Sequence, residues 1–119
     1  MENLFMLDTK TALAALAALA QESRLAIFRL LVQAGPAGVS ASKIAEALAV
    51  APSSLSFHLK ELSHADLLLP RQEGRFVFYS VKFDTMYALM AFLTDNCCGG
   101  EPCLPVCGTA CEIPAVSAS

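Results

Sequence analysis

Residues 42–81 read SKIAEALAVAPSSLSFHLKELSHADLLLPRQEGRFVFYSV, and this stretch decides the fold. The apolar spacing predicts a short helix from about Ser42 to Leu48. A second helix is expected to run from Pro52 to about Ala65, because proline is favoured at the first helical position. Two short helices joined by three or four residues form a helix-turn-helix.

The spacing then changes from helical to strand-like. Two β-prone runs, 67–70 and 75–81, flank the segment Arg71-Gln72-Glu73-Gly74, in which the glycine supplies a turn. A β-hairpin is therefore expected directly after the helix pair, in the place of a "wing". This order of elements is far more specific than a helix-turn-helix alone.

Helices are also expected on both sides of this unit. The first is capped at Asp8–Thr9 and ends near Ala20, and the second runs from about residue 23 to residue 34. The last is expected over residues 84–95, with Asp84 as its N-cap and an apolar stripe of Met86, Leu89, Met90 and Leu93. The predicted fold is α+β but mainly α, a winged helix-turn-helix over residues 1–95 followed by a flexible cysteine-rich tail over residues 96–119.

Composition limits the possible classes of protein. The chain has 119 residues, of which 55% are hydrophobic and 16% are charged, so one compact domain is expected rather than a disordered chain. Its longest bland apolar run, Ala12–Ala20, is about half of what a membrane span needs, and Glu2 precedes any basic residue, unlike in a signal peptide. We therefore expect a cytoplasmic protein with no membrane partner.

The charges are distributed unevenly. The whole chain carries a formal net charge of −3, which by itself argues against a nucleic-acid partner. Residues 24–82, however, hold seven basic and four acidic side chains, and most of the acidic residues lie outside this window. Contact with DNA phosphates requires local positive charge only, so double-stranded DNA is a plausible partner of the helix-turn-helix.

The second helix of the pair supplies most of the candidate DNA contacts. Placing Leu55, Leu59 and Leu62 inward turns short hydroxyl side chains, one aromatic ring and one lysine outward. Phe57 has two interpretations, contact with a thymine methyl group or packing against the wing, whereas His58 falls at the inward edge of the helix. With two arginines of the hairpin, the candidate DNA-binding residues are Ser53, Ser54, Ser56, Phe57, Lys60, Arg71 and Arg75.

All five cysteines lie between Cys97 and Cys111, and the first 96 residues have none. A disulfide framework would distribute them across the fold, so metal binding or redox sensing is the better interpretation. Cys97, Cys98 and Cys103 offer three soft thiolates, which suit the pyramidal coordination of arsenic(III) or antimony(III) better than zinc, which prefers four ligands. Cys107 and Cys111 could serve as further ligands or as capture thiols, or they could lack a function.

Several motifs together resemble the ArsR/SmtB family of winged-helix metal-sensing repressors. They are Leu19–Leu25, Lys43–Leu48, Ser53–Leu62, Gly74-Arg75 and Val77-Phe78-Tyr79. The resemblance implies a homodimer built from the first and last helices, and repression that ends when a metal or metalloid binds. One family site has Cys-Val-Cys where this chain has Ser40-Ala41-Ser42, and another needs a histidine on the last helix, where residues 84–95 have none.

The sensor is therefore expected in the tail, where Asn-Cys-Cys-x-x-x-x-Cys resembles an arsenite-sensing branch of the family. The expected function is a non-enzymatic, dimeric repressor that releases its operator when arsenic(III), or antimony(III), binds Cys97, Cys98 and Cys103. Two alternatives have the same fold, a zinc or cadmium sensor that uses four cysteines and a thiol-redox sensor. A thiol enzyme is disfavoured, because Asp95, Glu101 and Glu112 would raise a thiol pKa.

Overall fold

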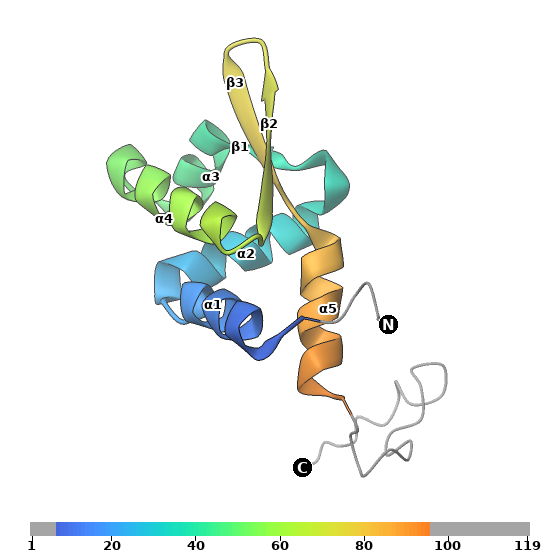
Figure 1. Cartoon of the computed structure of the whole chain (residues 1–119). Helices are drawn as coiled ribbons and strands as arrows, with labels where there is room; N and C mark the ends of the chain where they lie inside the picture. The colour runs from blue at the N-terminus through green and yellow to red at the C-terminus, as the bar shows by residue number, and fades with distance from the viewer. Residues whose placement is uncertain (1–6, 96–119) are drawn as a thin grey trace, which may run out of the picture.

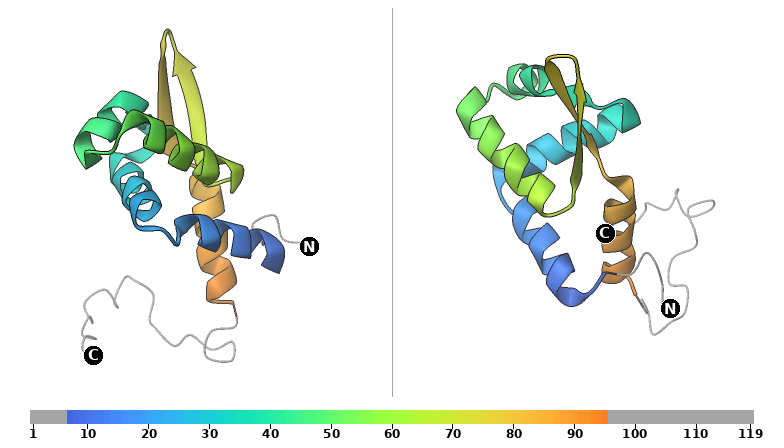
Figure 2. Two further views of the ribbon diagram at one scale, coloured as in Figure 1. Left: turned by 90° about the vertical axis from the view of Figure 1, so that its left-hand side faces the viewer. Right: turned by 45° about the horizontal axis from the view of Figure 1, so that its top comes forward.

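The computed structural model describes residues 7–95, which form a helical domain with one projecting β-hairpin (Figure 1). The elements, in chain order, are α1 (Thr9–Leu19), α2 (Glu22–Ala34), a 3₁₀ turn η1 (Gly35–Ala37), β1 (Val39–Ser40), α3 (Ala41–Leu48), α4 (Pro52–His64), β2 (Leu68–Glu73), β3 (Phe76–Val81) and α5 (Phe83–Leu93). The predicted winged helix-turn-helix is confirmed. The hairpin projects from one end of the domain, and α1 and α5 lie together at the other end (Figures 1 and 2).

The helix boundaries follow from local capping. The Asp8 carboxylate accepts a hydrogen bond from the N–H of Thr11 at 3.3 Å, which confirms the predicted cap of α1. Ser40 caps α3 through its hydroxyl, and Pro52 opens α4 at the first helical position, as predicted. The prediction that Asp84 caps the last helix is wrong. Lys82 is the N-cap residue of α5, and Asp84 lies inside the first turn.

The hairpin is longer than predicted, because residues 71–73 belong to β2 rather than to the turn. Glu73 pairs with Phe76, so only Gly74 and Arg75 form the loop. Gly74 has a φ of 64°, the positive value that a two-residue type II′ turn requires at its first central position. The wing therefore extends as a regular two-stranded ladder up to a tight tip.

A third strand, β1, was not predicted. Its two residues pair antiparallel with β3, Val39 with Tyr79 and Ser40 with Phe78, which gives the sheet order β1-β3-β2. Gly38 permits this pairing, because a Cβ atom there would lie 2.6 Å from the carbonyl oxygen of Tyr79. The wing is thus attached to the start of α3 through β1.

The core lies where α2, α3, α4 and the start of β2 meet. Its largest fully buried side chains are Ile27, Leu31, Ile44, Leu62 and Leu67. On α1 the buried stripe consists of Ala12, Ala15 and Ala18, whereas Leu13 stays 60% exposed. Small side chains allow α1 to approach the domain closely, and Leu16 and Leu19 pack against the edge of the core while partly exposed.

The apolar stripe of α5 is divided in the same way. Leu89 is buried, but Met90 and Leu93 are more than half exposed. No helix within residues 7–95 combines the length and the apolar character that a bilayer crossing requires. The predicted cysteine-rich tail, residues 96–119, lies outside the described residues.

Candidate nucleic-acid interface

Helix α4 has one buried face and one exposed face. Leu55, Leu59 and Leu62 are each no more than 2% exposed, as their spacing predicted. The opposite face carries the predicted contact residues of this helix, all of them exposed: Ser53, Ser54, Ser56, Phe57 and Lys60. The structure therefore brings five of the seven predicted DNA-binding residues together on one helical surface.

The start of α4 is open to a ligand. Ala51 is its N-cap residue and has no side chain that could accept a hydrogen bond, unlike Ser40 of α3 and Asp8 of α1. The first amide groups of a helix lack intrahelical acceptors, and they carry a partial positive charge. Hydroxyl groups of Ser53 and Ser54 flank these amides, so this end of α4 suits a phosphate oxygen or the edge of a base.

Phe57 is an aromatic residue on the polar face of α4. Its side chain is 55% exposed, and it lies outside the hydrophobic core of the described residues. Its one described aromatic neighbour is His58, at a centroid distance of 5.8 Å and edge-on. This geometry favours the interpretation that Phe57 faces a partner over the interpretation that it packs against the wing.

The two arginines of the wing have different surroundings. Arg75 occupies the two-residue tip, where it is exposed and has no ion-pair or hydrogen-bond partner among residues 7–95. Arg71 donates from Nε to Glu73 at 2.8 Å and from Nη2 to the carbonyl of Ala37 at 3.2 Å, and it stacks over Phe78 at 5.0 Å. The charge of Arg75 is thus available to a partner, whereas that of Arg71 is largely balanced within the protein.

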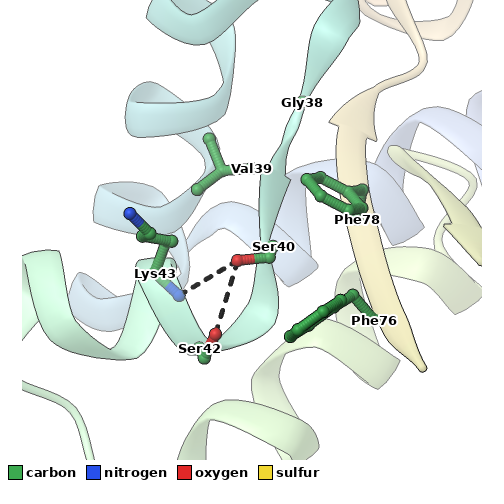
Figure 3. Close-up of a pocket in the computed structure, with 7 residues that line it drawn as sticks. All are labelled: Gly38, Val39, Ser40, Ser42, Lys43, Phe76 and Phe78. Carbon is green, nitrogen blue, oxygen red and sulfur yellow. Dashed lines mark hydrogen bonds between the residues drawn. The ribbon is translucent and has the colours of Figure 1, made fainter. Parts of the chain in front are cut away.

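A groove of about 400 Å³ separates the wing from the start of α3 (Figure 3). Phe76 and Phe78 line one side of it, and Ser40 and Ser42 line the other. Ser40 is buried and its hydroxyl caps α3 at the N–H of Lys43, 3.3 Å away. At the place where the resemblance puts Cys-Val-Cys, this chain therefore uses Ser40 to cap the helix.

The histidine and carboxylate side chains of the described residues bear on the predicted metal chemistry. Within residues 7–95 no group of three or more histidine, cysteine, aspartate or glutamate side chains is arranged to hold a metal ion. The predicted ligands Cys97, Cys98 and Cys103 lie outside the described residues, as do Cys107 and Cys111. The structure places the candidate DNA-binding residues but not these cysteines.

Comparisons with known proteins agree with the architecture. A family model described as a helix-turn-helix domain matches residues 19–71. None of the curated protein sequences matches the chain. Several solved structures resemble the chain, among them three whose names describe a regulator or a DNA-binding domain.

An ArsR-like transcriptional regulator from Rhodococcus sp. RHA1 has 27% identity and a TM-score of 0.63, over 71% of this chain and 76% of that one. A possible transcriptional regulator for arsenical resistance has 28% identity and a TM-score of 0.59, over 66% and 79%. The homodimeric winged helix-turn-helix DNA-binding domain of Mb0332 from Mycobacterium bovis, a possible ArsR-family regulator, has 26% identity and a TM-score of 0.60, over 77% and 85%.

Proposed function

We propose that this winged helix-turn-helix protein is a DNA-binding transcriptional regulator of the ArsR family. The observation that carries the proposal is the exposed face of α4, with its open N-terminus, serines, Phe57 and Lys60, beside a wing whose tip presents Arg75. In this arrangement α4 enters the major groove and the wing tip reaches the adjacent backbone or minor groove. The structural likeness to three proteins whose names describe regulators or DNA-binding domains supports this assignment.

We further propose that the regulator binds its operator as a homodimer. Four large apolar side chains of α1 and α5, Leu13, Tyr87, Met90 and Leu93, are each at least 55% exposed. Exposed apolar residues gathered on two helices at one end of a domain are typical of a protein interface. The homodimeric state of the Mycobacterium bovis domain supports the same conclusion.

DNA binding is tested with a duplex that the protein itself selects from a random-sequence pool. We expect specific binding by fluorescence anisotropy, with a palindromic site whose half-sites lie about one helical turn apart. Lys60→Ala should weaken binding to all duplexes, whereas Ser54→Ala should alter the preference among them. Failure to enrich any sequence would contradict the assignment.

The proposed inducer is arsenic(III), with antimony(III) as a second ligand, held by Cys97, Cys98 and Cys103. Three soft thiolates match the pyramidal demand of these ions. Cys97 follows the last residue of α5 by four positions, so that a ligand bound there can act on a helix of the proposed dimer interface. A small change at this interface alters the spacing of two recognition helices, and DNA tolerates little change in that spacing. One structural neighbour is named for arsenical resistance, which supports the choice of ligand.

The inducer is tested by adding arsenite, antimonite, zinc, cadmium or peroxide to the complex of reduced protein and duplex. Release by arsenite, lost in Cys97→Ser, Cys98→Ser and Cys103→Ser but kept in Cys107→Ser, is the expected result. X-ray absorption should show three sulfur ligands. Four sulfurs would indicate a zinc or cadmium sensor, and release by peroxide alone would indicate a thiol-redox sensor.

A further inference from the structure

One side chain, that of Arg24, connects three helices. Arg24 lies in the first turn of α2, where the side chain of Gln21 accepts its backbone N–H at 2.9 Å. Its Nε–H donates to the carbonyl of Ala18, in the last turn of α1, at 2.7 Å. Its Nη1 lies 3.4 Å from Nδ1 of His58 on α4. Arg24 therefore joins the corner between α1 and α2 to the helix that carries the exposed serines.

The contact between Arg24 and His58 requires a neutral imidazole ring. A guanidinium group can only donate, so Nδ1 must be the acceptor and the ring proton must lie on Nε2. Protonation of His58 would remove that acceptor and place two cations side by side. Both side chains are half-buried, so water screens the contact less than it would on an open surface.

This contact restricts the rotation of α4 about its own axis, which the core contacts alone define only loosely. Leu55, Leu59 and Leu62 hold α4 against the domain, but apolar contacts have little directional preference. The hydrogen bond at His58 is directional, and His58 is next in sequence to Phe57 on the exposed face. A rotation of α4 about its own axis would break the bond and would move Phe57 and the serines together.

We infer that Arg24 is a positioning residue for DNA recognition, acting through His58 to set the rotation of α4 relative to α1. The inference rests on the proposed function, because it deepens the account of the same DNA-binding surface. Arg24 touches no DNA in this scheme. It transmits the position of α1, a helix of the proposed dimer interface, to the surface that reads the operator.

A second histidine of α4 lines the same cleft as Arg24. A cleft of about 330 Å³ between α1 and α4 is lined by Arg24, Glu61 and His64 as its only polar or charged side chains, and the α1 side consists of alanines. His64 is an exposed histidine on the same helix, with no described hydrogen bond to Arg24. It is therefore a matched control for substitution of His58.

The test compares four proteins, wild type, Arg24→Lys, His58→Gln and His64→Gln, on the duplex selected by the wild type. His58→Gln, whose amide oxygen can still accept from Arg24, should bind about as well as the wild type. His64→Gln should also bind like the wild type, because His64 has no described hydrogen bond to Arg24.

Arg24→Lys should bind about tenfold more weakly than the wild type while keeping its helical circular dichroism and its cooperative unfolding. An unchanged affinity in Arg24→Lys would overturn the inference, as would an equal loss of affinity in His58→Gln and His64→Gln. Nitrogen NMR of the free protein gives a readout without DNA, in which His58 should carry its proton on Nε2. A proton on Nδ1 would exclude the contact, whereas absence of DNA binding in the wild type would refute the proposed function.

Discussion

Gly38 is a residue at which the absence of a side chain determines local structure. Its φ of 77° and ψ of −177° lie in a region that is open almost only to glycine, and a Cβ atom would collide with the backbone of Tyr79. Gly35 has nearly the same backbone conformation, with φ 79° and ψ −167°, but a Cβ atom added there would meet nothing within 4 Å. Substitutions at the two glycines can therefore separate the energetic cost of backbone strain from the cost of a steric collision.

We expect Gly35→Ala to lower the free energy of unfolding by about 1–3 kcal/mol, the usual cost of such a conformation. Gly38→Ala should cost clearly more, because the collision involves a backbone oxygen and would displace β1 from β3. Chemical denaturation followed by circular dichroism gives both values. Equal losses in the two variants would contradict the close approach at Gly38.

The two wing arginines should differ in their contribution to salt dependence. Arg75→Ala should reduce the slope of log affinity against log salt concentration by about 1, the value for one lost phosphate contact. The double variant Arg71→Ala/Glu73→Ala removes an ion pair without changing the net charge, so its slope should stay near that of the wild type. Titration of the selected duplex at several salt concentrations measures both. A large change in the double variant alone would assign the phosphate contact to Arg71 instead.

Among the elements, α1 depends on a charged cap. Hydrogen bonding by the side chain of Thr11, and to a smaller extent by its backbone N–H, holds the pKa of Asp8 below its usual value, so the carboxylate favours the folded state. This contribution is present above the pKa of the unfolded chain and is lost as the pH falls through the lower pKa of the folded state. The start of α1 should therefore be sensitive to acid.

The substitution Asp8→Asn tests this dependence, because asparagine caps a helix well but does not titrate. Between about pH 6 and about pH 3, the wild type should lose more stability than Asp8→Asn, and the two should differ little in slope above about pH 5. Thermal unfolding at a series of pH values measures the difference. Parallel curves over the whole range would show that the Asp8 cap does not contribute to acid sensitivity.

At the scale of the element, the sequence predicts most of the structure of the wing and α4. The leucine stripe and Pro52 define the buried face and the start of α4, because both depend on local spacing and backbone geometry. The turn is predicted less well, since residues 71–73 are polar and yet belong to β2. Pairing with β3 provides their backbone hydrogen bonds, and this pairing overrides their weak preference for a strand.

At the scale of the whole molecule, α1 and α5 lie at the end opposite the wing (Figure 2). Both helices carry exposed apolar side chains. If this surface joins two copies, a charge placed in it should separate them. Met90→Glu and Leu93→Glu should convert a dimer into a monomer by light scattering and should lower operator affinity by at least about tenfold, because each half-site alone binds weakly.

Leu69→Glu is the matched control for this experiment. Leu69 is 47% exposed, comparable to Met90, but it lies on β2 of the wing. It should leave the oligomeric state unchanged. A dimer that survives both α5 substitutions would place the interface elsewhere.

The sequence by itself determined the order of the five α-helices and of the two hairpin strands, the leucine face of α4 and the residues on its outer face. These features depend on local periodicity, on turn-forming glycine and on proline at the start of a helix. It also singled out the clustered cysteines, whose role as a sensor stays a prediction. For these properties neighbours in the chain supply the decisive interactions.

Tertiary structure alone decided which polar side chains are available to a partner. Arg71 and Arg75 are both arginines of the predicted hairpin, and the sequence predicts DNA contact for both. In the structure Arg71 is bound by Glu73 and by the carbonyl of Ala37, which lies 34 positions away. The strand β1 and the contact between Arg24 and His58 likewise join segments that are remote in the chain. No local pattern encodes such contacts, because their energy depends on the distance and direction between groups that only the folded chain brings together.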